Sequence, residues 1–211
     1  MLQTQIAEDS TLELLRSLQQ KDYLNGFYLV GGTALAFYYG HRKSIDIDLF
    51  TNQPFDATWL LEQMQQDYPV QLYHTAPGTI KASINKVNVD LITHRYPYLA
   101  EPFIFDGFML LSEKDIIAMK LNAISVSGQR SKDFIDIFFA LENHSIANIL
   151  SYYQKKYKQE GDMHILKSLI YFNDVDLSDW PVLLKNPDLK WKEVKVRIEK
   201  ELLAYTKSKN F

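Results

Sequence analysis

Cysteine is absent from this chain of 211 residues, and its absence excludes several kinds of chemistry at once. Without thiols the chain can form no disulfide framework, no thiolate zinc site and no iron–sulfur cluster. A cysteine-free composition fits a reducing compartment, and we expect the protein to be cytoplasmic.

Long apolar runs are also absent. No window approaches the ~20 apolar residues that a membrane helix needs, and no N-terminal stretch combines a basic start with an apolar segment. We therefore expect no membrane partner.

An excess of positive charge is missing as well. The formal net charge of −3 argues against a broadly basic surface that binds nucleic acid without specificity. Two local basic clusters, at residues 155–158 and 190–197, fit either solvated helix faces or a rim that contacts RNA.

The five histidines show neither the spacing of metal ligands nor a partnership with a serine and an acid, so a hydrolase triad has little support.

The pattern of apolar residues divides the chain into two parts. Up to about residue 110, apolar runs typical of strands alternate with helical periodicity, and beyond that point almost every segment is helical. We therefore predict an α+β fold, with an α/β core over residues 1–110 and a helical domain over residues 111–211. Strands are expected near residues 27–30, 44–50, 70–74, 79–84 and 86–94, with a last extended segment within 103–112. Helices are expected near residues 11–20, 33–40, 55–66, 112–125, 131–143, 146–159, 162–172 and 188–207.

An aspartate pair stands in the second predicted strand, "SIDIDLF". Residues two apart in a strand share a face, so Asp46 and Asp48 should lie together while Ile45, Ile47 and Leu49 point into the core. Two carboxylates about 4 Å apart repel by roughly 4 kcal/mol at an effective dielectric constant near 20. The pair therefore calls for a cation or for solvent, and Mg²⁺ suits carboxylates that also meet phosphate oxygens.

A third acid, Asp90, lies in "KVNVDLI", with Val87, Val89 and Leu91 expected on the opposite, inward face. If this strand neighbours the first, three carboxylates can hold two metal ions. By spacing alone, all three acids also fit the polar face of a half-exposed strand.

Gly31 and Gly32 stand where a predicted strand passes into a helix. Backbone N–H groups and the helix dipole favour phosphate at such a junction. A strand–Gly–Gly–helix corner by itself is more often a tight turn. The corner combined with a same-face acid pair on the next strand is a much rarer pattern, and it favours phosphate binding.

Several segments together resemble a known family. "GGTAL", "HRKSIDIDLF", "LLSEKDIIAMKLNAI" and "RSKDFIDIFFAL" are similar to motifs of the AbiEii/AbiGii-type toxin nucleotidyltransferases, a branch of the DNA polymerase β-like nucleotidyltransferase superfamily. The resemblance extends over about residues 12–200. It implies a nucleotidyltransferase-type mixed sheet with flanking helices, followed by a C-terminal helical bundle.

The resemblance also implies roles for individual residues of the first part. Asp46 and Asp48 would bind the metal ions, and Asp90 falls where the superfamily places its third acid. The triphosphate would be held by Gly31, Gly32 and Thr33.

Five further candidates follow from the motifs. The residue pattern around Lys120 fits a surface lysine, whereas the resemblance makes it a phosphate-contacting or catalytic cation. Asp133 and Asp136 share a helix face, and we expect Asp136 to pair with Lys120 or another basic residue. We expect Asp133 to take part in nucleotide binding. Alternatively, its negative charge in the first helical turn interacts favourably with the helix dipole. Arg42 would neutralise phosphate, and Ser44 would either hydrogen-bond in the cleft or simply begin the strand.

Together these expectations describe a nucleotidyltransferase dependent on Mg²⁺, with two ions expected and Mn²⁺ as an alternative. It would move a nucleotidyl group from a nucleoside triphosphate to an acceptor hydroxyl, with tRNA or another RNA favoured. The resemblance implies a toxin-like role beside an antitoxin protein. Two alternatives remain open: a nucleotide-binding regulatory protein without activity, and a nucleotidyltransferase that modifies antibiotics.

Overall fold

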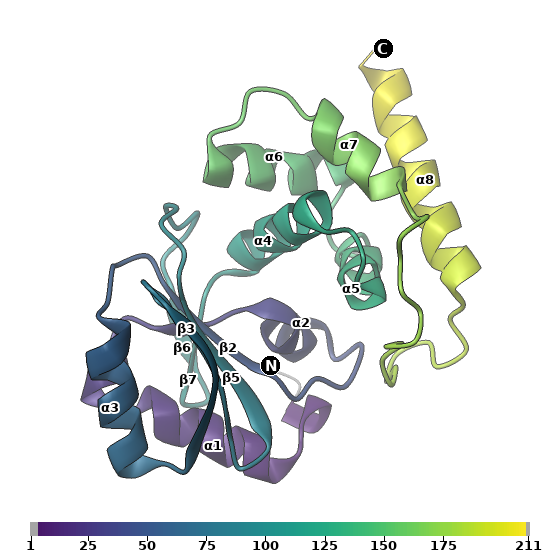
Figure 1. The fold of residues 1–211 in the computed structure, drawn as a ribbon. Coiled ribbons are helices and arrows are strands. Elements are labelled where there is room, and N and C mark those ends of the chain that lie inside the picture. Colours follow the sequence, from purple (N-terminus) through teal and green to yellow (C-terminus); the bar gives the residue numbers. More distant parts are fainter. Residues whose placement is uncertain (1–3, 210–211) are drawn as a thin grey trace. The chain divides into compact units, whose positions relative to one another are not determined.

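The computed structural model describes residues 4–209 and separates the chain into two compact units, with the boundary between Ser112 and Glu113. The first unit contains a mixed sheet with helices, and the second is helical throughout its regular elements (Figure 1). The predicted α+β class is confirmed.

Seven strands form one sheet in the first unit, in the order β3-β4-β5-β2-β1-β7-β6. The central pair β2 and β5 is parallel, as is the pair β1 and β7, whereas the remaining neighbours are antiparallel. The extended segment predicted near residue 105 is a hairpin of two short strands. The strands are β1 (Tyr28–Leu29), β2 (Ile47–Thr51), β3 (Val70–Ala76), β4 (Thr79–Ile84), β5 (Val87–Thr93), β6 (Phe103–Phe105) and β7 (Phe108–Leu110).

The two-residue turn between β4 and β5 fixes their register. Asn85 and Lys86 both have positive φ, 51° and 68°, which is the backbone of the tight hairpin turn that matches the twist of the strands. The antiparallel register that follows places Lys81 opposite Asp90.

Alternation along β2 places its apolar side chains in the core, where Ile47 and Leu49 are fully buried. The expectation that Ile45 also points inward is wrong, because 54% of its surface is exposed. The reason is that the ladder begins at Ile47, so the alternation of a strand does not extend back to residue 45.

The helices of the first unit begin and end at recognisable residues. The side chain of Asp56 accepts hydrogen bonds from the backbone N–H groups of Thr58 and Trp59 and so caps its helix. Gly40, with φ of 61°, ends the helix after the glycine corner. The helical elements are η1 (Thr4–Ile6), α1 (Asp9–Gln19), η2 (Asp22–Leu24), α2 (Gly31–Tyr39) and α3 (Ala57–Asp67).

The second unit is built around its first helix, α4, which packs against three others, α5, α6 and α7. The long last helix, α8, contacts α5, α6 and α7. No helix within residues 4–209 has the length and apolar character needed to cross a membrane. The elements are α4 (Glu113–Val126), α5 (Ser131–Ala140), α6 (Ile146–Tyr157), α7 (Met163–Ile170) and α8 (Trp191–Ser208).

Candidate active site

The glycine corner joins β1 to α2 and brings two charged side chains against the backbone. Gly31 has φ of +71°, a conformation that favours glycine, and α2 starts at this residue. A Cβ atom on Gly31 would lie 2.0 Å from Oδ2 of Asp48, and one on Gly32 would lie 2.1 Å from Nη2 of Arg42. Both glycines are therefore required for the acid and the arginine to approach this closely.

The start of α2 has no side-chain cap. Its N-cap residue is Val30, which has no hydrogen-bonding atom in its side chain. The first backbone N–H groups of a helix have no partner within the helix, and together with the dipole they make an anion site. The corner thus has the local chemistry expected of a phosphate-binding turn.

The two aspartates of the motif lie beside this corner, both half-buried. Asp48 is within β2, and its carbonyl oxygen accepts a hydrogen bond of 2.9 Å from the backbone N–H of Val30. Asp46 lies just before the strand, where Nδ2 of Asn88 donates to its Oδ1 over 3.0 Å. Asp46 is thus held by a neutral donor, and the carboxylate of Asp48 packs closely against the backbone of Gly31.

Asp90 stands next to Asp48 in the sheet, because the parallel register of β2 and β5 pairs these two residues. Residues paired in this way project to the same face. The carboxylate of Asp90 forms an ion pair of 3.0 Å with Nζ of Lys81 on β4. The predicted third acid is therefore beside the pair but has a lysine as its partner.

Thr33 and Ser44 tie the first turn of α2 to the segment that carries the acids. The hydroxyl group of Thr33 lies 2.9 Å from the Oγ atom of Ser44, and it also donates to the backbone carbonyl group of Asp46. Thr33 is almost fully buried. These contacts indicate that both side chains position the loop before β2.

Arg42 is buried, with 3% of its surface exposed. Its Nη1 atom donates to the carbonyl oxygen of Lys43 over 3.1 Å, while Nη2 packs against Gly32. A buried guanidinium group behind the glycine corner adds positive charge close to the start of α2.

The donor set suits a hard cation. Asp46 and Asp48 offer carboxylate oxygens near a helix start that attracts phosphate, which is the combination that Mg²⁺ prefers. Among residues 4–209, no three carboxylate or imidazole groups are gathered closely enough to form a ready-made metal cluster. The residues present therefore fit a metal held by two carboxylates and completed by substrate oxygens.

Three further candidates meet one another in the second unit. Nζ of Lys120 lies 2.6 Å from Oδ1 of Asp133 and 2.9 Å from Oδ2 of Asp136. All three side chains are buried, so the interpretation of Lys120 as a solvated surface lysine is wrong. The expected pairing of Asp136 with Lys120 is confirmed.

A second buried ion pair was not predicted. Lys156 of α6 and Asp115 of α4 are both fully buried, with Nζ and Oδ1 2.7 Å apart. Lys156 therefore does not belong to a surface basic cluster, unlike its exposed neighbour Lys155. The signal for this existed in the sequence, since Lys156 follows the buried residues Ile149 and Tyr153 at helical spacing.

Sequence reasoning also missed the partners of the acids. Lys81 and Asp90 are equally distant from the turn Asn85–Lys86, so a two-residue hairpin places them opposite each other. Asn88 could be found only once β2 and β5 were known to be parallel neighbours, and short segments do not reveal this pairing.

Known proteins share this fold. A crystal structure of an H. pylori protein described as a candidate nucleotidyltransferase superposes with a TM-score of 0.58 and 17% identity over 98% of this chain and 97% of that chain. The nucleotidyltransferase toxin MenT4 of Mycobacterium tuberculosis H37Rv gives a TM-score of 0.54 and 14% identity over 91% of this chain and 82% of that chain.

Sequence comparison identifies relatives more directly. An uncharacterized protein of Aquifex aeolicus (strain VF5) is 33% identical over an alignment of 168 residues that covers 77% of this chain and 81% of that protein. Residues 13–206 match the family described as nucleotidyl transferase AbiEii toxin of type IV toxin–antitoxin systems. The match confirms the resemblance seen in the motifs, and the chain belongs to the AbiEii nucleotidyltransferase toxin family.

Proposed function

We propose that this chain transfers a nucleotidyl group from a nucleoside triphosphate to a hydroxyl group of RNA, with tRNA as the favoured acceptor, in a metal-dependent reaction. Membership of a nucleotidyltransferase toxin family supports the reaction class. The observation that carries the proposal is the close packing of the Asp48 carboxylate on Gly31, which joins an acid pair to the start of a helix.

The triphosphate would bind at the start of α2. Backbone N–H groups of Gly31, Gly32 and Thr33 would donate to phosphate oxygens, since the N-cap residue has no side-chain acceptor that competes for them. Arg42 would contribute positive charge from behind the corner, and Ser44 would hold Thr33 in place.

Asp46 and Asp48 would hold the metal, and Mg²⁺ is the ion that their oxygen donors suit best, with Mn²⁺ as a substitute. When bound, such an ion supplies Lewis-acid stabilisation of the charge that develops on phosphate oxygens. A second ion would require Asp90 as a ligand. Since Lys81 now pairs with Asp90, this acid would have to exchange its lysine partner on binding.

Lys120, Asp133 and Asp136 of the second unit are further candidates for a role in the reaction, either in phosphate contact or in positioning. Lys120 lies between the buried carboxylates of Asp133 and Asp136. Direct contact between Lys120 and phosphate would therefore require one carboxylate to release it. A positioning role, in which the ion pairs fix α5 against α4, needs no such release.

RNA is favoured as the acceptor because lysines at the beginning of α8 are exposed. Lys190 and Lys192 project into solvent there, whereas Arg197 donates to the backbone carbonyl of Leu141. Exposed lysines provide phosphate contacts independent of sequence. The family also implies a cognate antitoxin protein as a partner of the toxin.

The proposal is tested by incubating the protein with Mg²⁺, each of four α-labelled nucleoside triphosphates and total tRNA. We expect label on RNA with the unchanged chain and a loss of at least roughly a hundredfold in the variant D46N/D48N, because the metal ligands are removed. Glu62→Gln is the matched control, since it removes a carboxylate at an exposed position of α3.

Each outcome has a distinct meaning. Absence of label on RNA, together with triphosphate binding that D46N/D48N loses, would reject the RNA acceptor and favour a nucleotide-binding protein or another acceptor. Equal labelling by the unchanged chain and D46N/D48N would reject the role of the acid pair.

A further inference from the structure

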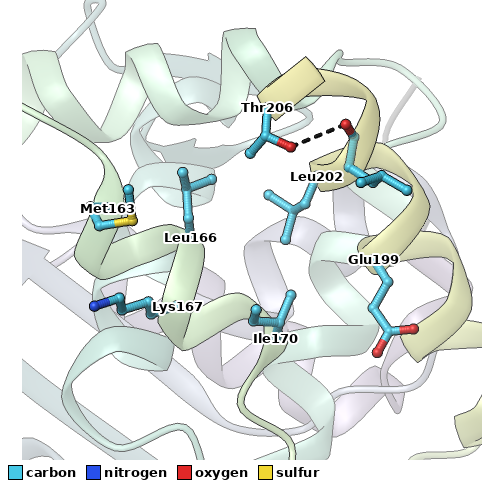
Figure 2. A pocket seen from close by; sticks show the side chains of 8 residues that line it. Met163, Leu166, Lys167, Ile170, Glu199, Leu202 and Thr206 are labelled. Atoms are coloured by element: carbon cyan, nitrogen blue, oxygen red, sulfur yellow. Dashed lines mark hydrogen bonds between the residues drawn. The ribbon is translucent and has the colours of Figure 1, made fainter. Parts of the chain in front are cut away.

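A groove lined by apolar side chains lies between α7 and α8 in the second unit and has a volume of about 520 Å³. Leu166 and Ile170 come from α7 and Leu202 from α8, and Figure 2 shows these side chains lining the groove from both helices. Met163, Ile170 and Leu203 are 51%, 51% and 56% exposed. Clustered apolar side chains with this much exposure mark a surface that another molecule covers.

One further exposed apolar side chain, Val196, lies on the face of α8 that carries Glu199 and Leu203. Val196, Glu199 and Leu203 are three and four residues apart, so they share a face of the helix. Val196 is 52% exposed. None of these residues belongs to the candidate active site, and the proposed transfer reaction gives them no role.

One charged residue of each sign stands on the walls of the groove. Lys167 lies on α7 and Glu199 on α8, on opposite sides in Figure 2. Both are exposed, and neither forms an ion pair with any other residue in the part of the chain that the structure describes. A wall pair of opposite sign leaves the groove without net charge, so it does not select a strongly acidic or strongly basic partner.

We infer that this groove is the contact surface of a homodimer. A two-fold axis running along the groove turns the α7 wall of one copy onto the α8 wall of the other. Lys167 of each copy then faces Glu199 of the second copy, which gives two ion pairs, while the exposed side chains of Ile170 and Leu203 are covered. The surface is therefore self-complementary in both charge and apolar character.

An unrelated partner would need its own matching pattern of charge, whereas a second copy supplies this pattern by symmetry. A homodimer also explains why exposed apolar residues lie on both walls, since each wall covers the other. Binding of a different protein in place of a second copy is an outcome that the following experiment detects.

Sedimentation of the full chain over a range of micromolar concentrations tests the inference through a charge exchange. We expect the unchanged chain to dimerise. Lys167→Glu places two acids against each other at both contacts and should raise the dissociation constant of the dimer roughly tenfold or more, and Glu199→Lys should do the same with two cations. The double variant K167E/E199K restores opposite charges and should recover dimerisation.

A second pair of variants tests the apolar contact. Leu203→Glu introduces a charge into the covered surface and should give a monomer, whereas Val182→Glu introduces the same charge at a residue that is 63% exposed outside the groove and should leave the dimer intact. Circular dichroism verifies that each variant is folded. A monomeric unchanged chain, including one that binds a different protein through the groove, overturns the inference, and so does failure of K167E/E199K to recover what the single exchanges lose.

Discussion

The acid pair of the first unit and the buried lysines of the second unit differ in how far they are exposed to solvent. In the first unit, Asp46 and Asp48 are half-exposed, Asn88 donates to Asp46, and Asp48 packs against Gly31. In the second, Lys120 and Lys156 are buried and lie within 2.6–2.9 Å of aspartate carboxylates. The acid pair is therefore partly open to solvent, whereas the buried lysines are enclosed together with aspartate partners.

Burial also changes what a charge contributes to stability. Removing one member of a buried ion pair leaves an uncompensated charge in a medium of low dielectric constant, whereas replacing both members by apolar groups is often neutral. A half-exposed carboxylate keeps much of its hydration and can be neutralised at little cost. Substitutions should therefore affect stability in the second unit and activity in the first.

The largest effect on stability is expected from Lys156→Met, which removes the lysine that forms an ion pair with the fully buried Asp115. We expect the free energy of unfolding to fall by about 3–5 kcal/mol. Urea denaturation followed by tryptophan fluorescence measures it, since Trp180 and Trp191 lie in the second unit and Trp59 in the first.

Two controls make this prediction specific. Lys155→Met makes the same change at the adjacent exposed residue and should alter the free energy of unfolding by less than about 0.5 kcal/mol. The double variant D115L/K156M should recover most of the loss. Equal changes in the free energy of unfolding for the substitutions at 155 and 156 would show that the buried ion pair contributes no more to stability than an exposed lysine.

An intermediate effect is expected at the glycine corner, where Gly31→Ala should lose transfer activity because its Cβ would displace the carboxylate of Asp48. The left-handed backbone adds a cost of about 1–2 kcal/mol in the free energy of unfolding. Gly26→Ala is the matched control, since Gly26 has φ of +83° but nothing within 4 Å of its added Cβ.

Transfer assays measure the loss of activity in both variants, and thermal unfolding measures the backbone cost separately. We expect similar backbone costs, with loss of activity in Gly31→Ala alone. If Gly26→Ala lost activity to the same extent, the contact between residue 31 and Asp48 would not be the cause.

The smallest effect is expected at the exposed carboxylate Asp67. A hydrogen bond from Tyr23, followed by one from Lys21, lowers the pKa of this carboxyl group. Because the pKa is lower in the folded protein, the charged form stabilises the fold above the pKa of the unfolded chain, and the contribution is lost as the pH falls through the folded value.

Melting temperatures of the unchanged chain and Asp67→Asn should therefore differ slightly near about pH 7 and converge near about pH 2. Tyr23→Phe should reproduce part of the difference, since the hydroxyl group of Tyr23 lies 2.8 Å from Oδ2 of Asp67. A difference that stayed constant over this range would exclude the carboxylate as its source.

The sequence predicted the elements well where periodicity and turn residues agreed. The order of strands and helices, the stop of α2 at Gly40 and the face shared by Asp133 and Asp136 all follow from local patterns. Ile45 was misplaced because alternation does not indicate where a ladder begins.

Contacts between distant segments could not be predicted in the same way. The parallel pairing of β2 with β5 joins Asp48 to Asp90, and no local signal indicates that these strands are neighbours. Lys156 and Asp115 are likewise 41 residues apart, and only the packing of α6 on α4 brings them together. The candidate site could be named from the sequence, but the partners that hold its acids could not.

The turn Asn85–Lys86 has a consequence for how the chain tolerates changes in length. It sets the distance along the hairpin from Lys81 to Asp90. If the turn kept two residues, one inserted residue would move Lys81 away from its position opposite Asp90 and would turn the buried side chains of one of the two strands to the other face of the sheet. Evolution can therefore vary the exposed loops of this unit far more freely than this turn of two residues.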